Sequence, residues 1–371
     1  MDENSRNIVD SLQELNRNLK LASFSQIADA IVESLNIQET HTILASMLVN
    51  ARVRHLNADL VSNLANSERD EFSAISSIDA PIGMMSSDAS ALLGREGYMF
   101  LVGGSNDVLR QYSTMCNDDA DVVAQWSRLI TNRIERAASE RVRYHHLIIP
   151  EKISIIPELF PRPIASPTRV LDQLEQVLLR EHGGSIYTSV REIFWKLRDR
   201  KSVCRKTDSH LAPFGSFLIF KYIMQELFCH NVADYKFSEN GFSYGDLSFR
   251  MLGLFLPELE HKVDLSGLPH FTARATKSAE FVPEDCSHMG RRQVWRNPEA
   301  PIREKIVVFG NSYFSFAENG QSTLSWWFSR WFQEFHFVWT NEMDWDYVAD
   351  QKPQVVIWQG TERFLRVVPG C

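Results

Sequence analysis

Apolar positions divide the chain into a helical first part and a longer part in which strand-like and helix-like runs alternate. Over residues 5–70, apolar residues recur three and four positions apart, in segments such as SRNIVDSLQELNRNL and FSQIADAIVESL. This spacing is typical of amphipathic helices. We therefore expect a helical N-terminal region over residues 1–75, with a role in packing or oligomerisation rather than in catalysis.

A polar loop over residues 76–90 leads into a second region, 90–371, which we expect to form one domain. Helical patterns cover residues 122–141, 168–181 and 215–228, and short continuous apolar runs cover residues 146–149, 305–309, 335–339 and 354–358. Repeated strand–helix–strand order predicts a parallel sheet with helices on both faces, a three-layer α/β/α fold. Residues 231–300 are expected to be rich in loops.

Composition supports a folded chain and excludes several classes of protein. The 371 residues are 44% hydrophobic and include 23 Phe and 9 Trp, enough for a sizeable core. At helical spacing, Trp326, Trp327 and Trp331 favour a place in this core over a sugar-stacking platform. The net charge of −8 argues against a nucleic-acid partner. The five cysteines have no CxxC spacing, so we expect reduced thiols, no disulfide framework and no metal site.

The N-terminal segment MDENSRNIVDSLQELNRN is polar and acidic. It lacks the basic and apolar regions of a secretory signal, which favours a cytoplasmic location. No apolar run approaches the ~18–20 residues that a membrane span needs, so we expect no transmembrane segment.

The most informative stretch is IREKIVVFGNSYFSF, over residues 302–316. Its β-branched run ends abruptly at Gly310-Asn311-Ser312, as a buried parallel strand does when it passes into a tight turn. Reactive groups in α/β folds lie at the carboxyl ends of such strands. The hydroxyl of Ser312 is therefore a candidate nucleophile, with backbone N–H groups nearby to bind an oxyanion.

A serine nucleophile needs a base, and the base needs a group that fixes its tautomer. Asp208 and His210, two positions apart on one predicted loop, could fill these roles. The alternative is that Asp208 caps the helix beginning near Pro213 and that His210 lies on the surface. From spacing alone this alternative is favoured, because Asp-x-His is common by chance.

Several stretches resemble, in the same order, the SGNH-like acyltransferase family of bacterial exopolysaccharide modification, typified by the alginate O-acetylation proteins. The resemblance covers residues 90–365 and rests on GREGYMFL (94–101), HLIIPEK (146–152) with IPE (156–158), TDSH (207–210) with Gly215, GDL (245–247), VVFGNSY (307–313), DWD (344–346) and VVI with ERFL (355–365). Each motif is weak alone, but their common order makes the signal stronger.

The resemblance implies a catalytic triad of Ser312, His210 and Asp208, in which the Asp-x-His motif precedes the serine, the reverse of ordinary SGNH hydrolases. Asn311 stands where the family has Asp, and Leu211 where it has Trp. Because the alginate proteins act outside the cytoplasmic membrane, the resemblance makes a periplasmic location the alternative.

The resulting hypothesis is a serine-dependent carbohydrate O-acyltransferase, most simply an O-acetyltransferase, that works through an acyl-serine. The backbone N–H of Ser312 is the first expected oxyanion donor, and Asn311 or Tyr313 is a candidate second donor. Arg363 is a candidate contact for the substrate or oxyanion. Its alternative is a structural ion pair with Glu362 or Asp346.

The expected partners are a carbohydrate or polysaccharide and, as a further candidate, an acyl-donor protein. An acyl donor of unknown identity is required, but no cofactor. Two other functions stay open: a carbohydrate acetylesterase of the same fold, since water or a sugar could resolve the acyl-serine, and a non-catalytic glycan-binding module.

Overall fold

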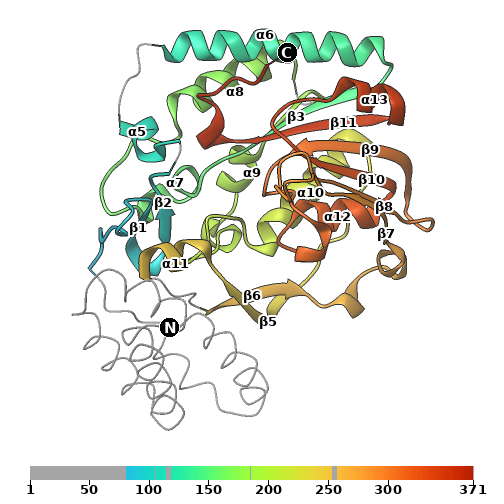
Figure 1. Ribbon diagram of the computed structural model, residues 1–371. Helices are drawn as coiled ribbons and strands as arrows, with labels where there is room; N and C mark the ends of the chain where they lie inside the picture. Colours follow the sequence, from blue (N-terminus) through green and yellow to red (C-terminus); the bar gives the residue numbers. More distant parts are fainter. Residues whose placement is uncertain (1–80, 105, 114–117, 184, 253–256, 371) are drawn as a thin grey trace, which may run out of the picture. The chain divides into compact units, whose positions relative to one another are not determined.

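A seven-stranded sheet lies at the centre of the part of the chain that the structure describes. The computed structural model describes residues 81–370 except 105, 114–117, 184 and 253–256, and these residues belong to one unit of the chain (Figure 1). The helices predicted over residues 1–75 lie outside the described residues.

The strands of this sheet follow the order β4-β3-β11-β9-β10-β8-β7. The first five run parallel to one another: β4 (Tyr187–Ser189), β3 (Arg143–Ile149), β11 (Val355–Thr361), β9 (Ile302–Gly310) and β10 (Phe332–Trp339). Register pairs Gly310 with Trp339 and Thr361 with Ile149, so the carboxyl ends of β9, β10, β11 and β3 meet at one edge. This edge is where an α/β fold places reactive groups.

The five parallel strands confirm the predicted parallel sheet, and the structure adds two antiparallel strands at one side, β8 (Arg292–Arg296) and β7 (Thr276–Phe281). Both strands come from residues 231–300, which were expected to be rich in loops. The same region forms a separate pair of strands, β5 (Phe237–Tyr244) and β6 (Pro257–Val263). All six residues of β7 and four of the eight in β5 are exposed, so no alternation of apolar residues marked these strands.

Helices cover both faces of the sheet, which confirms the three-layer α/β/α architecture (Figure 1). One face carries α6 (Asp119–Ser139), α8 (Arg169–Glu181) and α13 (Trp345–Gln351). The other carries α9 (Val190–Trp195), α10 (Pro213–Phe228) and α12 (Leu324–Trp331). The helices predicted over residues 122–141, 168–181 and 215–228 are thereby confirmed as α6, α8 and α10.

Alternation along the central strands explains how one sheet supports two cores. In β9, Ile306 and Val308 pack on the α10–α12 face, whereas Val307 and Phe309 pack on the α6–α8 face. All four side chains are fully buried. Trp326, Trp327 and Trp331 of α12 are buried in the first of these cores, as their spacing predicted.

Shorter elements surround the edge at which the parallel strands end. They are β1 (Ala91–Leu93), β2 (Met99–Leu101), α5 (Val108–Ser113), α7 (Lys152–Ile155) and α11 (Asp246–Leu252). The loop that carries Asp208 and His210 runs between a short helical turn, Arg200–Val203, and the start of α10.

Candidate active site

Ser312 lies directly beyond the carboxyl end of β9, on a turn that is tied to the neighbouring strand β11. Asn311 donates its backbone N–H to Gln359 Oε1 and its side-chain Nδ2 to Thr361 Oγ1, each at 3.0 Å. A Cβ at Gly310 would lie 2.8 Å from Gln359 Oε1, so a side chain there would require the Gln359 amide that binds Asn311 to shift. The turn therefore takes its position from the sheet.

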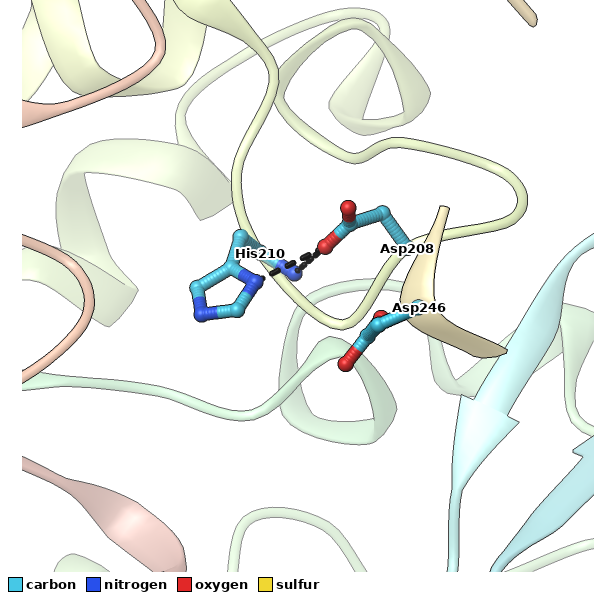
Figure 2. A group of neighbouring side chains, drawn as sticks. All are labelled: Asp208, His210 and Asp246. Carbon is cyan, nitrogen blue, oxygen red and sulfur yellow. Dashed lines mark hydrogen bonds and ion pairs between the residues drawn. The ribbon is translucent and has the colours of Figure 1, made fainter. Parts of the chain in front are cut away.

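Asp208 and His210 form the hydrogen bonds of a base and its orienting group (Figure 2). Asp208 Oδ1 lies 2.8 Å from His210 Nδ1 and accepts the backbone N–H of His210 at 2.8 Å. Because a carboxylate can only accept, Nδ1 carries the proton and Nε2 presents a lone pair. His210 Nε2 lies 2.9 Å from Ser312 Oγ, so the serine hydroxyl can donate to it.

The structure thus brings together the three residues of the expected triad, although the serine lies 102 positions after the histidine. It also decides against helix capping as the role of Asp208. The residue before the first turn of α10 is Ala212, and no side chain caps that turn. His210 is partly buried rather than a surface residue, with 30% of its side chain exposed.

Asp208 is buried, and two groups stabilise its charge. Burial alone would raise the pKa of Asp208, but the hydrogen bonds and charge of His210, with the nearby Arg205, outweigh it and hold the pKa below the ordinary value. Arg205 lies 3.5 Å from Asp208 Oδ2 and also pairs with Glu260 of β6. An ionised carboxylate at this place can stabilise an imidazolium on His210.

Lys152, at the start of α7, fixes the catalytic loop to the end of β3. Its buried Nζ donates to the carbonyl oxygens of Asp208 (2.6 Å), Met99 (2.8 Å) and Lys206 (3.4 Å). Burial lowers the pKa of Lys152. The sequence marked this residue as part of the HLIIPEK motif, but nothing in the motif indicated which groups it binds.

Two carboxylates bind backbone N–H groups of the same loop. Glu258 of β6 accepts the backbone N–H groups of Lys206 and Thr207 at 2.8 and 2.7 Å. Asp246, the first residue of α11, accepts the N–H of Ser209 at 2.7 Å. Asp246 belongs to the GDL motif, whereas no sequence signal pointed to Glu258.

The candidate oxyanion donors differ in whether their N–H or O–H groups already have a hydrogen-bond acceptor. No described residue accepts a hydrogen bond from the backbone N–H of Ser312. The N–H of Tyr313 donates to Asn311 Oδ1 at 3.3 Å, and the Tyr313 hydroxyl donates to the carbonyl of Ser209 at 3.1 Å. The N–H of Ser312 is therefore the donor best placed for an oxyanion, and a role for Asn311 or Tyr313 stays a prediction.

Arg363 is buried below the site and forms an ion pair that the sequence did not indicate. Its NH1 donates to Glu151 Oε1 at 2.7 Å, and its guanidinium carbon lies 5.9 Å from the centre of the Tyr313 ring. The expected alternative partners, Glu362 and Asp346, are thus replaced by Glu151. A contact between Arg363 and substrate stays a prediction.

Glu362 is a fully buried carboxyl that joins three segments at the same sheet edge. It accepts the backbone N–H groups of Glu151 and Thr168, each at 2.8 Å, and the hydroxyl of Ser154 at 2.9 Å. Burial raises the pKa of Glu362 to about 7 in spite of these hydrogen bonds. The group holds the loop after β3 and the start of α8 against the end of β11.

Asp208, His210 and Asp246 are also close enough to suggest a cation site, since one ligand atom of each lies within 4.8 Å of the others (Figure 2). These atoms already have partners, however. Asp208 bonds to His210, Asp246 bonds to Ser209, and His210 Nε2 bonds to Ser312. A metal ion would have to replace these bonds, so we assign the group to the triad and its support.

A cavity of about 300 Å³ lies far from these residues. Arg143 and Val355, the first residues of β3 and β11, form part of its lining, whereas Ser312 lies at the opposite ends of the parallel strands. The cavity therefore has no part in the site.

Among the described helices, none has the length and apolar character needed to cross a bilayer.

No protein-family model matches this sequence, and neither does any curated protein sequence. Several solved structures have a similar course of the backbone, of which three are described. The O-acetyltransferase domain of Pseudomonas putida AlgJ is 15% identical over 76% of this chain and 94% of its own, with a TM-score of 0.48. Bacillus cereus PatB1 is 13% identical over 74% and 96%, with a TM-score of 0.46.

The third, a DHHW family protein from Eubacterium siraeum, is 12% identical over 78% of this chain and 96% of its own, with a TM-score of 0.48. At these identities and TM-scores, the likenesses identify neither a family nor a reaction for this chain. Its function is inferred below from its own residues.

Proposed function

We propose that the protein is a serine-dependent O-acyltransferase that moves an acyl group, most simply acetyl, onto a carbohydrate hydroxyl. The observation that carries the proposal is the 2.9 Å contact between Ser312 Oγ and His210 Nε2, continued at 2.8 Å to Asp208. This chain of hydrogen bonds activates a serine for attack on an acyl carbonyl.

In the first half of the reaction, Ser312 Oγ forms a bond to the carbonyl carbon of the acyl donor. His210 Nε2 takes the proton of the hydroxyl, and Asp208 stabilises the imidazolium that results. The N–H of Ser312, which has no acceptor among the described residues, donates to the developing oxyanion. His210 then gives its proton to the leaving group, and an acyl-serine remains.

In the second half, a sugar hydroxyl attacks the acyl-serine. His210 takes the proton of that hydroxyl and returns it to Ser312 Oγ as the serine–acyl bond breaks. The product is a sugar ester and the enzyme is regenerated. A sugar as acceptor is what the resemblance of the sequence motifs implies; water in the same place would make the protein an esterase.

The proposal is tested with the full chain, a chromogenic acetyl ester and a mixture of oligosaccharide acceptors. We expect release of the chromophore and an increase in oligosaccharide mass by one acetyl group. Ser312→Ala should reduce both by about a thousandfold or more. Chromophore release without acetylated sugar would assign an esterase. A folded wild-type protein that binds oligosaccharides but turns over no ester would instead assign a binding module.

A further inference from the structure

Ser209, the residue between Asp208 and His210, is bound at both its backbone and its side chain by one carboxylate. Asp246 Oδ1 accepts the backbone N–H of Ser209 at 2.7 Å, and Asp246 Oδ2 accepts its hydroxyl at 2.8 Å. Ser209 is 7% exposed, so water has little access to compete for these bonds. Figure 2 shows Asp246 beside Asp208 and His210 without a bond to either.

Asp246 is itself held firmly against the loop. The next two residues, Leu247 and Ser248, donate their backbone N–H groups to the carbonyl of Thr207 at 3.0 and 3.1 Å. The preceding residue, Gly245, touches the same peptide, because a Cβ there would lie 1.9 Å from the Thr207 oxygen. The first turn of α11 and the catalytic loop therefore form one packed unit.

We propose that Asp246 is a positioning residue that sets the placement of His210 and Asp208 through its two bonds to Ser209, an inference that rests on the proposed function. Residues 207–210 belong to no helix or strand, so their backbone conformation depends on hydrogen bonds from neighbouring segments. A shift of about 1 Å in a catalytic group can cost about a hundredfold in rate. Without the two bonds to Asp246, the peptide before His210 is held, among the described residues, only by the Tyr313 hydroxyl, which donates to the Ser209 carbonyl at 3.1 Å, and by Asp208, which accepts the N–H of His210. We expect this loss to loosen the placement of the imidazole.

A second explanation of any effect at Asp246 is its negative charge, since its carboxylate lies within 4.8 Å of a ring nitrogen of His210. Other charged groups near His210 are Asp208 on the same loop, Arg205 before it and Lys152 beneath it. Asp246→Asn separates the two explanations. Its amide oxygen can still accept the N–H of Ser209, and its amide nitrogen can donate to the Ser209 hydroxyl.

The test compares wild type, Asp246→Ala and Asp246→Asn in the full chain, with a chromogenic acetyl ester. For Asp246→Ala we expect kcat to fall about 10–100-fold while KM changes less than twofold. Asp246→Asn should recover most of the lost kcat. Asp264 is a matched control, because it accepts the N–H and hydroxyl of Ser266 at 2.9 and 2.8 Å on an exposed turn. Asp264→Ala should leave kcat unchanged.

A second readout is the rate at which phenylmethanesulfonyl fluoride modifies Ser312, which needs the triad but no natural substrate. It should fall in Asp246→Ala by a factor similar to that in kcat, and recover in Asp246→Asn. If wild type were modified quickly but turned over no ester, the proposed function would fail while this rate still tested the positioning of the loop.

Three results would overturn the inference. One is a folded Asp246→Ala protein that keeps the wild-type kcat and modification rate. Another is an Asp246→Asn protein as impaired as Asp246→Ala, which would assign the effect to charge. If Asp246→Ala does not fold, Ser209→Ala removes the hydroxyl bond to Asp246 together with a 3.4 Å contact between Ser209 Oγ and His210 Nδ1. An unchanged modification rate in this variant together with an impaired Asp246→Asn would reject the role.

Discussion

The nucleophile and its base are positioned by two different kinds of structure. Ser312 follows a strand whose backbone is paired on both sides, and the turn is tied to β11 through Asn311. His210 lies on a loop whose backbone groups are bound mainly by side chains from distant segments, Lys152 and Asp246 among them. The sheet therefore positions the Ser312 hydroxyl, whereas individual side-chain hydrogen bonds position the His210 imidazole.

This difference indicates where the site is robust and where it is fragile. The turn that carries Ser312 is held by many backbone hydrogen bonds of a cooperative sheet, so the loss of one nearby side chain should move it little. A substitution at one of the side chains that hold the loop removes a large part of what fixes His210. We therefore expect residues that touch no substrate to affect catalysis strongly on the loop side, and weakly on the sheet side.

The largest effect on kcat should come from replacing Ser312 or His210, the two residues that contact each other. Ser312→Ala and His210→Ala should each lower kcat for a chromogenic acetyl ester by about a thousandfold or more. Because the two side chains act as a unit, the double variant should be little worse than either single one. Steady-state kinetics would show this, with folding of each variant checked by circular dichroism. If the loss in kcat of the double variant equalled the product of the two single losses, the residues would act independently and not as nucleophile and base.

Lys152→Met should give the next largest effect, because it removes the cation that binds three loop and strand carbonyls. The Lys206 carbonyl would keep the N–H of Met99 at 2.8 Å, so the carbonyls of Asp208 and Met99 are the two that lose the ammonium donor. A buried carbonyl left without a donor costs about 1–3 kcal/mol, so we expect a loss of about 2–4 kcal/mol in the free energy of unfolding. We also expect kcat to fall about a hundredfold. Urea denaturation and ester kinetics measure the two effects.

A surface lysine provides the control for this variant. Lys201 pairs at 3.0 Å with Glu96, and both side chains are exposed. Lys201→Met should therefore leave stability and kcat unchanged within error. If Lys152→Met behaved in the same way, the loop would not depend on that cation.

Glu362 allows the sheet side to be tested by pH. Its folded-state pKa of about 7 lies above the ordinary value near 4.5, so between these two values the folded protein binds more protons than the unfolded chain. The protonated form is thus favoured by folding, and this contribution is present below about pH 4.5 and lost as pH rises through about 7. We expect it to amount to a few kcal/mol.

Urea denaturation of wild type and Glu362→Gln at pH 5 and pH 8 measures this contribution. Wild type should lose more stability between these two values than Glu362→Gln, which cannot ionise at this position. Equal losses in both proteins would show that the Glu362 carboxyl titrates at its ordinary value in the folded state.

The smallest effect should follow from removing metal ions. Dialysis against EDTA should leave ester turnover unchanged, since the ligand atoms of Asp208, His210 and Asp246 are engaged in the hydrogen bonds of the triad and its loop. If EDTA abolished activity and Zn²⁺ or another divalent cation restored it, these three residues would instead be assigned to a metal site.

Local patterns in the sequence predicted the sheet side of this comparison well. The apolar run of residues 306–309 and its break at Gly310 are visible in any short window, and they placed Ser312 at the end of a buried strand. The helices α6, α8 and α10 followed from apolar spacing in the same way. The antiparallel strand β7 could not be found, because its six residues are all exposed and show no alternation.

The loop side could be predicted only in part. Asp208 and His210 were identified because they are two positions apart, and the resemblance gave that spacing a meaning. Their supports are long-range contacts: Lys152 is 56 positions from Asp208, and Asp246 is 37 from Ser209. Lys152 and Asp246 both belong to motifs that carried the resemblance, but nothing local indicated which groups they bind. The pairing of Arg363 with Glu151, 212 positions away, was missed for the same reason.

The most direct test of the central claim is to map the site of modification after treatment with phenylmethanesulfonyl fluoride, by mass spectrometry of peptides. We expect one sulfonyl adduct per chain, on the peptide that contains Ser312. It should be absent in Ser312→Ala and form far more slowly in His210→Ala. A folded protein in which Ser312 stays unmodified, or is modified as fast without His210, would contradict the proposal that these residues form a nucleophile and its base.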